Sequence, residues 1–329
     1  GVPDTSPAMT INKLCGSGLR AVSMAAQFIM LGDADVILAG GTESMTNAPY
    51  LLDKARNGYR MGHGQIIDSM IYDGLTDVFN QYHMGITAEN IAEQWKISRE
   101  EQDEFSYQSH MKAAAAWKEG KFKDEVVPIK VKEVYVDTDM KKKTREFVVD
   151  TDEGIRPDTT PEALAKLKPV FAQNGTVTAG NSSQTSDGAA FVCVMSERMV
   201  KQLNVKPLAR LVSYAVAGVE PRIMGIGPVA AIPKALKAAG KKLDDIDLIE
   251  LNEAFAAQSL AVVKELGIDR SRLNVNGGAI AVGHPLGSSG ARLSVQIINE
   301  LRRQKKKYGM VTACVGGGQG VAGIYEIID

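Results

Sequence analysis

The sequence has almost no excess charge of either sign and few long hydrophobic runs. Its 329 residues include 38 Lys and Arg against 39 Asp and Glu, a formal net charge of −1. Such a balance creates no overall field that attracts nucleic acid or an anionic membrane. We also expect no apolar run long enough to span a bilayer, and no secretory signal. Neither nucleic acid nor a membrane is therefore expected as a partner.

Cysteine is scarce as well. Three cysteines without a C-x-x-C pair argue against a disulfide framework or a zinc site, and favour reduced thiols in the cytoplasm. No metal site is expected. The glycines at 40–41 and 316–318 lack the spacing and the downstream acid of a dinucleotide fingerprint, so no nicotinamide cofactor is expected. Cys193 lies in the apolar run 189–195, which predicts a core cysteine in a strand.

What the sequence does contain favours an α/β fold. Aromatic residues make up only 6%, whereas there are 32 glycines, a composition that suits tight turns between strands and helices. At 44% hydrophobic residues, a chain of this length can bury more than one core. Two lobes or domains are therefore expected.

Two distant segments repeat the order helix then strand. An apolar stripe at helical spacing over 19–29 precedes Gly32, and 36–39 predicts a buried strand. Near the other end, a striped helix is predicted over 290–301 and a strand over 310–313. Two similar halves are the natural interpretation.

A second repeat signal is the sequence GSGLR at 16–20, which echoes GSSGAR at 287–292. Between the halves lies a polar, charge-dense region in which a capping box at 98–101 predicts a helix start. Such an insertion usually covers a site. We divide the chain into an N-terminal half (1–45 and 179–198), an inserted loop or lid domain (46–178) and a C-terminal half (199–329).

Two thiols and one imidazole lie in glycine-rich turns. Cys15 precedes a predicted helix, whose N-terminus should lower the thiol pKa, although a buried structural cysteine is an equal alternative. Cys314 follows the predicted strand, and Gly316 has a backbone N–H that can approach an oxyanion, although a simple tight turn would look the same. His284, between glycines and a proline, is suited to deprotonate a thiol or polarise a carbonyl, or else to packing.

Asn252 follows the apolar run 246–251, at a strand end of the kind where open α/β sheets place their ligands. Its amide can hold a water or a carbonyl oxygen, and the alternative is a helix N-cap.

Together, Cys-x-Ser at 15–17, Asn-Glu-Ala-Phe at 252–255, Gly-His-Pro at 283–285 and Cys-x-Gly at 314–316 resemble the thiolase family, in particular its short-chain, biosynthetic-type acetyl-CoA acetyltransferases. The likeness covers nearly the whole chain and includes 82–85, 175–181 and 274–279. Four motifs in the correct order are a specific signal.

The resemblance implies a ping-pong Claisen condensation of two acetyl-CoA to acetoacetyl-CoA and free CoA, with reverse thiolysis and no cofactor. Cys15, activated by His284, would form the acetyl-enzyme. Cys314 would then remove a proton from the second acetyl-CoA, while His284 and a water on Asn252 hold the enolate. Backbone N–H groups of Cys15 and Gly316 would hold the tetrahedral intermediate.

Residues that contact CoA are implied in the same way, mostly in the insertion and nearby loops. They are Leu75, His83, Met84, Arg156, Phe171, Ala179, Ser183, Met224, Ala254 and Phe255. The charge of Arg156 suits a nucleotide phosphate, and a solvated surface arginine is an equal alternative. Bulky side chains at 82–85 resemble the short-chain branch, which disfavours long acyl chains.

The implied fold is a five-layer α-β-α-β-α core of two similar halves, assembled as a homodimer or homotetramer. Complete relatives carry several dozen residues before the position of Gly1, so the first half is expected to be N-terminally truncated. The stretch 131–152 looks like a surface hairpin extension. A degradative 3-ketoacyl-CoA thiolase and a non-catalytic acyl-CoA-binding homologue remain as alternatives.

Overall fold

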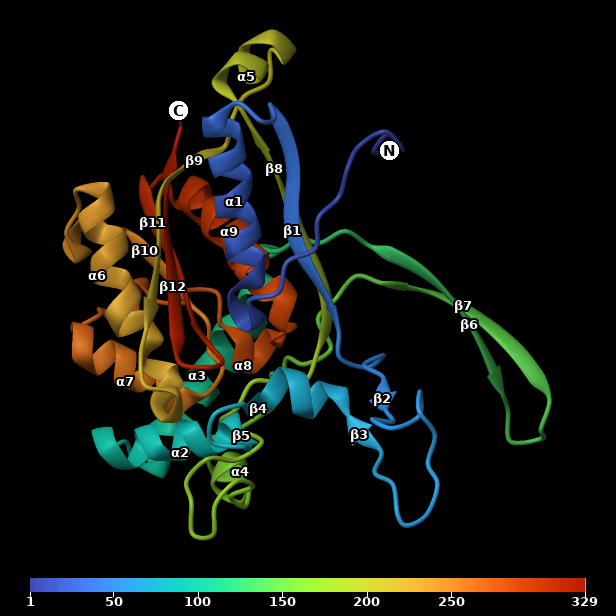
Figure 1. The fold of residues 1–329 in the computed structure, drawn as a ribbon. Coiled ribbons are helices and arrows are strands. Elements are labelled where there is room, and N and C mark those ends of the chain that lie inside the picture. The colour runs from blue at the N-terminus through green and yellow to red at the C-terminus, as the bar shows by residue number, and fades with distance from the viewer. Residues whose placement is uncertain (329) are drawn as a thin grey trace.

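The computed structural model describes residues 1–328, and its largest sheet has four strands in the order β10-β11-β12-β9. Strands β10 and β11 are parallel, and the other neighbours are antiparallel. The bounds are β9 Ala209–Gly218, β10 Leu248–Leu251, β11 Tyr308–Val315 and β12 Gln319–Ile327. Every residue of β10 is buried because helices cover both faces of this sheet (Figure 1).

The helices on the two faces create two apolar cores. Helices α6 (Gly227–Ala239) and α7 (Ala256–Leu266) cover one face, and α1 (Ser17–Leu31) and α9 (Leu286–Gln304) cover the other (Figure 1). The first core contains Ile232, Ile249 and Ile324. The second contains Leu19, Leu293 and Val311. Neighbouring residues of one strand, such as Met310 and Val311, point into different cores because side chains alternate along a strand.

A second sheet pairs the two ends of the N-terminal half. Strand β1 (Val36–Ser44) is antiparallel to β8 (Asp187–Met195), with Val36 opposite Met195, so the chain between them forms an insertion. Helices α1 and α9 lie between the two sheets (Figure 1). The layered α/β core is thus confirmed, and residues 1–328 form four successive layers, with no helix on the far face of β1 and β8 (Figure 1).

That far face corrects one expectation. Cys193 is exposed, opposite Leu38 in the register, rather than in the core. Leu38 and Phe191 are 58% and 50% exposed on the same face. The apolar run predicts burial on both sides, whereas only the inward-facing Val192 and Val194 pack against the core that contains Val22 and Ala25.

Helices α1 and α9 cross at the two echoing sequences. A Cβ on Gly18 would lie 2.6 Å from the backbone N of Ala291, and a Cβ on Gly290 would lie 2.3 Å from the backbone N of Leu19. Only glycine allows such close backbone contact. The repeat seen in the sequence is therefore also a contact in space.

The same α1 corrects a second expectation. The segment Leu14–Leu31 is long and apolar enough to cross a membrane by length and composition, contrary to the sequence-based prediction. It is instead a partly buried helix of the central layer, which explains its composition because neighbours pack on several of its sides.

The insertion consists of short strands, helices and one long hairpin. Its elements are β2 Tyr50–Leu51, β3 Ile67–Asp68, η2 Met70–Leu75, β4 Thr76–Asp77, β5 Tyr82–His83, α2 Met84–Trp95, α3 Arg99–Lys118, β6 Ile129–Val136, β7 Lys142–Val149 and α4 Pro161–Ala165. The capping box that begins α3 is present, formed by Ser98 and Glu101. Smaller elements elsewhere are η1 Leu14–Gly16, α5 Glu197–Leu203, η3 Pro221–Ile226, η4 Leu243–Asp245, η5 Arg270–Arg272 and α8 Ala279–Val282.

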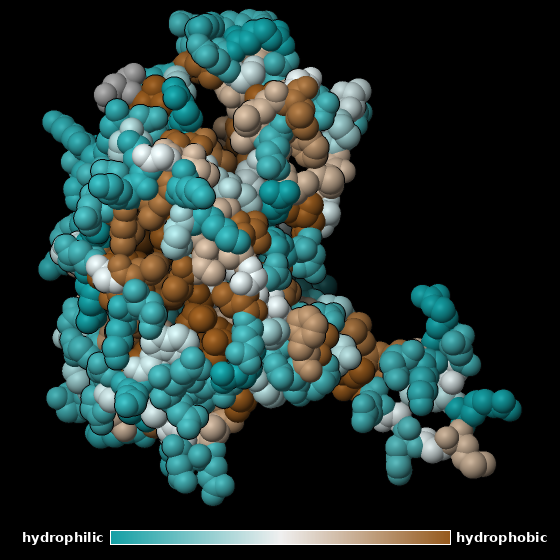
Figure 2. All heavy atoms as spheres, turned by 60° about the vertical axis from the view of Figure 1, so that its left-hand side comes forward, coloured by the Kyte–Doolittle hydropathy of each residue, from teal (hydrophilic) through white to brown (hydrophobic). Residues whose placement is uncertain are grey.

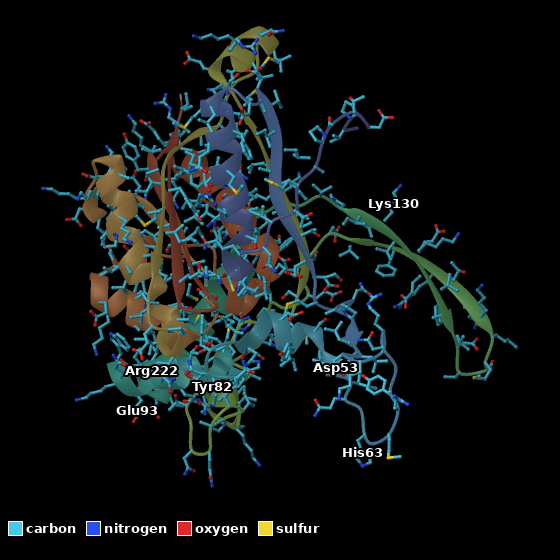
Figure 3. The ribbon with its side chains drawn as sticks, viewed as in Figure 1. Asp53, His63, Tyr82, Glu93, Lys130 and Arg222 are labelled. Carbon is cyan, nitrogen blue, oxygen red and sulfur yellow. The ribbon has the colours of Figure 1, made fainter. Side chains whose placement is uncertain are left out.

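The hairpin of β6 and β7 confirms the predicted surface extension. Ile129 pairs with Val149, and the arm projects from the body with a mostly hydrophilic tip (Figures 1 and 2). Lys130 on this arm and His63 on the loop between β2 and β3 lie away from the layered core (Figure 3). The hairpin therefore contributes nothing to the core.

Candidate active site

Cys15 lies in a tight turn at the start of the central helix α1. The preceding residue, Leu14, has a φ of 47°, in the left-handed region that non-glycine residues seldom adopt. The Cys15 side chain is buried, and the backbone N–H groups of Gly316 and of Cys15 itself donate hydrogen bonds to its sulfur. The two amides that were predicted to hold an oxyanion thus converge on the reactive atom.

The pKa of Cys15 shifts in the direction opposite to the prediction. Burial raises the pKa of the thiol to about 11, because the interior disfavours the thiolate. The amides of Gly316 and Cys15 lower the pKa of the thiol, but burial outweighs them, and the charge of Glu43 raises the pKa further. Cys15 therefore rests as a neutral thiol.

Cys314, at the end of β11, faces the same site. Its side chain is fully buried, and burial raises the pKa of its thiol above the usual range, with a further contribution from the charge of Cys15. A Cβ on Gly316 would lie 2.3 Å from Met84 Cε and 2.7 Å from Leu14 Cδ1, so the backbone there is closely packed. The fold thus brings together two thiols that are 299 positions apart.

His284 and Asn252 contact each other through their side chains. Asn252 Nδ2 lies 3.2 Å from His284 Nε2, and His284 Nδ1 lies 2.6 Å from Ser289 Oγ. Burial lowers the pKa of His284 to about 3, and the positive charge of Arg292 lowers it further, so the imidazole is neutral. Asn252 is not a helix cap, since α7 begins after Phe255.

Asn252 Oδ1 is buried and has no hydrogen-bond partner among the described residues. A buried carbonyl oxygen of this kind can accept a hydrogen bond from a bound water molecule.

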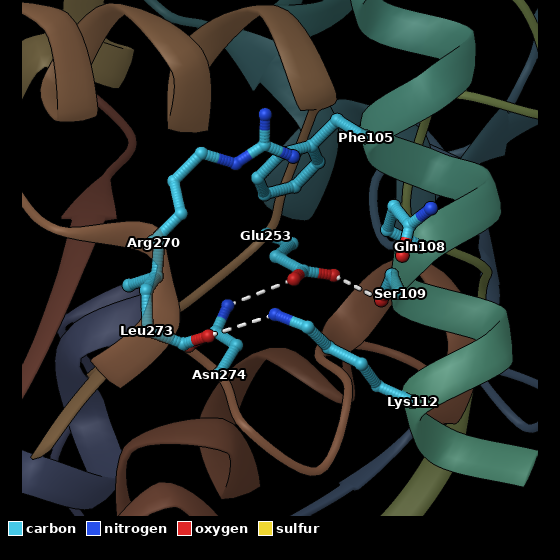
Figure 4. Close-up of a pocket in the computed structure, with 8 residues that line it drawn as sticks. All are labelled: Phe105, Gln108, Ser109, Lys112, Glu253, Arg270, Leu273 and Asn274. Carbon is cyan, nitrogen blue, oxygen red and sulfur yellow. Dashed lines mark hydrogen bonds between the residues drawn. The ribbon is translucent and has the colours of Figure 1, made fainter. Parts of the chain in front are cut away.

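Glu253, next to Asn252, anchors this loop, a role the sequence did not reveal. Its carboxylate accepts hydrogen bonds from Ser109 Oγ at 2.7 Å and Asn274 Nδ2 at 2.8 Å (Figure 4). It also accepts one from the N–H of Ile280 at 3.2 Å. Ser109 belongs to α3, so the insertion is fastened to the loop that carries Asn252. Burial raises the pKa of Glu253, and these donors oppose the rise.

Several predicted substrate residues pack together beside Cys314. Met84, Met224, Ala254, Phe255 and Phe171 form one apolar cluster with this cysteine.

The remaining predicted residues lie around that cluster or outside it. The His83 ring stacks on Phe171 with centroids 4.7 Å apart, and the N–H of Ser183 donates to the Ala254 carbonyl at 3.0 Å. Leu75 is the last residue of η2. This end of η2 lies near the His284 segment, because a Cβ on the preceding Gly74 would be 3.2 Å from Leu286, two residues after His284. Ala179 and Arg156 are exposed; the backbone N–H of Arg156 donates to His110 Nδ1 at 3.1 Å, and the Arg156 carbonyl accepts from the N–H of Thr159 at 3.3 Å.

A cavity of about 400 Å³ opens beside the turn that carries Cys15. Leu14 and Gly316 form part of its wall, and the remainder comes mostly from η2 and the segment that follows. Its lining residues are Leu14, Tyr72, Asp73, Thr76, Val78, Phe79, Gln81, Gly316, Gly317 and Gln319. Its size is that of small-molecule sites in general.

Comparison with known proteins identifies the family. Residues 1–198 match the model of the thiolase N-terminal domain, and residues 205–327 match that of the thiolase C-terminal domain. The chain belongs to the thiolase family.

Similar thiolases are known from several organisms. An acetyl-CoA acetyltransferase of Pseudomonas aeruginosa is 56% identical over 322 residues, which are 98% of this chain and 80% of that protein. The corresponding protein of Chromobacterium violaceum is 54% identical with the same coverage.

Solved thiolase structures agree with the fold. The acetyl-CoA acetyltransferase of Bacillus anthracis has a TM-score of 0.94 at 46% identity and covers 99% of this chain, which spans 80% of that one. Human mitochondrial 3-ketoacyl-CoA thiolase has a TM-score of 0.94 at 49% identity, with coverages of 100% and 81%.

Proposed function

We propose that this thiolase is an acetyl-CoA C-acetyltransferase that condenses two acetyl-CoA to acetoacetyl-CoA and CoA and catalyses the reverse thiolysis. The observation that carries the proposal is the convergence of the two electrostatically interacting thiols of Cys15 and Cys314 with the backbone amides of Cys15 and Gly316, together with the neutral imidazole of His284 beside Asn252. The names of relatives more than half identical to this chain support the same reaction.

The first half-reaction transfers an acetyl group to Cys15. His284 accepts the thiol proton, and the sulfur attacks the thioester carbonyl. The tetrahedral oxyanion then receives hydrogen bonds from the N–H groups of Cys15 and Gly316, which already point at the sulfur. The carbon–sulfur bond to CoA breaks, and CoA leaves with the proton.

The second half-reaction forms a carbon–carbon bond. Cys314 gives its thiol proton to His284, and the resulting thiolate removes a proton from the methyl group of a second acetyl-CoA, while the His284 imidazolium and a water on Asn252 stabilise the enolate oxygen. The carbanion attacks acetyl-Cys15, the carbon–sulfur bond to Cys15 breaks, acetoacetyl-CoA leaves, and the Cys15 thiolate takes its proton back from His284. The unpartnered Oδ1 of Asn252 supports the place of this water.

The acyl and pantetheine parts of the substrate suit the apolar cluster around Cys314. Phe171, Met84 and Phe255 offer apolar surface to a pantetheine arm, and the exposed Arg156 offers positive charge to a nucleotide phosphate. CoA thioesters are the substrates, and the reaction needs neither cofactor nor metal. We further propose the short-chain, biosynthetic-type subclass, a homodimer or homotetramer, and a cytoplasmic location.

A degradative 3-ketoacyl-CoA thiolase is the second candidate. The likeness to human mitochondrial 3-ketoacyl-CoA thiolase and the cavity beside Gly316 favour it. Thiolysis rates with acetoacetyl-CoA and with a medium-chain 3-ketoacyl-CoA distinguish the two. A higher kcat/KM for the medium chain would replace the first proposal.

Mass spectrometry after mixing with acetyl-CoA tests the covalent step. The Cys193→Ser protein is the background, because this exposed thiol is an unrelated target. An acetyl adduct is expected on Cys15, and Cys15→Ser should abolish it. Cys314→Ala should still form the adduct but lose condensation. A folded protein without any adduct would favour the non-catalytic binder.

A further inference from the structure

Ser289 is a buried serine that the proposed mechanism does not use. It lies on the first turn of α9, four residues after Pro285, and its side chain is fully buried. Its Oγ lies 2.6 Å from His284 Nδ1 and 3.0 Å from the Pro285 carbonyl oxygen. The hydroxyl therefore stands between the catalytic imidazole and a backbone acceptor.

The protons in this network can be counted. A serine hydroxyl has one proton to donate and two lone pairs, and a neutral imidazole has one N–H and one acceptor nitrogen. On the other side of the ring, the amide NH₂ of Asn252 faces Nε2 at 3.2 Å, and an NH₂ group only donates. Nε2 must then accept, so the ring proton lies on Nδ1.

The remaining contacts agree with this assignment. Nδ1–H donates to Ser289 Oγ, whose own proton goes to the Pro285 carbonyl. In the reverse network the Asn252 amide is rotated by half a turn, so that its oxygen accepts from a protonated Nε2. The amide NH₂ is then the buried group without a partner. A buried donor without a partner is rarer than an under-used carbonyl oxygen, which favours the first network.

We infer that Ser289 is a positioning residue that holds His284 in the Nδ1–H tautomer, so that Nε2 carries a lone pair and can take the proton of Cys15. The inference rests on the proposed role of His284 as a base. It assigns to Ser289 the part that a hydrogen-bonded orienting group plays for other catalytic histidines.

Magic-angle-spinning NMR of the ¹⁵N-histidine-labelled 329-residue chain tests the tautomer directly. The chain has four histidines, so subtraction of a His284→Asn spectrum assigns the signals. The wild-type protein should show His284 protonated at Nδ1. Ser289→Ala should shift the ring toward the Nε2–H form and slow acetylation of Cys15 by about tenfold or more, given the size of general-base effects.

Ser294→Ala is the matched control. Ser294 is also fully buried on α9, and its Oγ donates to the carbonyl four residues earlier, at 2.7 Å, but it bonds to Tyr325 rather than to a histidine. This variant should keep both the Nδ1–H signal and the acetylation rate. Thermal unfolding of both variants confirms that they fold.

Two results would overturn the inference. One is a resting wild-type His284 protonated at Nε2, and the other is a folded Ser289→Ala protein with an unchanged tautomer. Because the tautomer is read without turnover, failure of the proposed function appears separately, as a missing adduct on Cys15 of the wild-type protein.

Discussion

The glycine crossing of α1 and α9 predicts that Gly290→Ala will impair catalysis more than stability. A Cβ at this position would lie 2.3 Å from the backbone N of Leu19, whereas ordinary contact begins at 3.4 Å. The helices must therefore separate by about 1 Å (3.4 − 2.3 Å). No side-chain rotation relieves the contact, because the atom that is struck belongs to the backbone.

The displacement acts directly on the proposed catalytic groups. Cys15 lies two residues before the start of α1, and His284 lies two residues before the start of α9. Misplacement of reacting groups by about 1 Å costs on the order of 100-fold in rate. Overpacking destabilises by about 1–3 kcal/mol, which the better helix propensity of Ala offsets by about 1 kcal/mol.

The assay measures Cys15 acetylation by stopped-flow release of CoA, beside urea unfolding of the same preparation. Gly32→Ala is the control, since Gly32 ends α1 with a φ of 82° and a Cβ added there would meet no atom within 4 Å. It should lose stability through backbone strain but keep the acetylation rate. Wild-type acetylation by a folded Gly290→Ala protein would refute the reasoning.

Two further predictions follow from buried ionisable groups. In a Cys193→Ser background, the rate at which iodoacetamide alkylates Cys15, followed by mass spectrometry, should rise about tenfold per pH unit from pH 7 to 10. The reason is that a thiol with a pKa of about 11 is only about 0.1% thiolate at pH 8. A rate that reaches a plateau near pH 7 would contradict this prediction. Glu253→Gln should lower the free energy of unfolding, measured in urea, by about 1–3 kcal/mol. The NH₂ group of glutamine would face N–H and O–H groups that now donate to the carboxylate. Glu197→Gln, in an exposed pair with Lys201, should change stability by less than about 1 kcal/mol, and equal effects of the two substitutions would argue against the anchoring role of Glu253.

Local patterns in the sequence were sufficient to predict the helix-then-strand repeat, the capping box of α3 and the hairpin extension. Each depends on residues that are close in the chain, such as Ser98 and Glu101. The glycine echo was also visible, but its meaning was not, because only the folded chain places Gly290 against Leu19.

The failed predictions about Cys193 and about the pKa of Cys15 concern environment rather than local structure. Cys193 is exposed because the outer face of β8 has no covering layer among residues 1–328, and an apolar run does not reveal how many layers surround it. The pKa of Cys15 rises because burial depends on the whole fold, whereas the helix N-terminus that should lower it is a local feature. Glu253 and Ser289 were missed because their partners are side chains that neither motif nor spacing relates to them.

The opposite pKa shifts of Cys15 and His284 constrain how the first step proceeds. With a thiol pKa of about 11 and an imidazole pKa of about 3, the neutral pair is strongly preferred to a thiolate with an imidazolium. A preformed ion pair is therefore rare in the resting protein, and proton transfer has to accompany attack on the thioester. At that moment negative charge passes from the sulfur to the carbonyl oxygen, where the amides of Cys15 and Gly316 are already in place. Burial makes Cys15 slow to react with small alkylating agents. It is nevertheless compatible with fast acylation by a thioester, because the carbonyl oxygen becomes an oxyanion beside these donors during the attack.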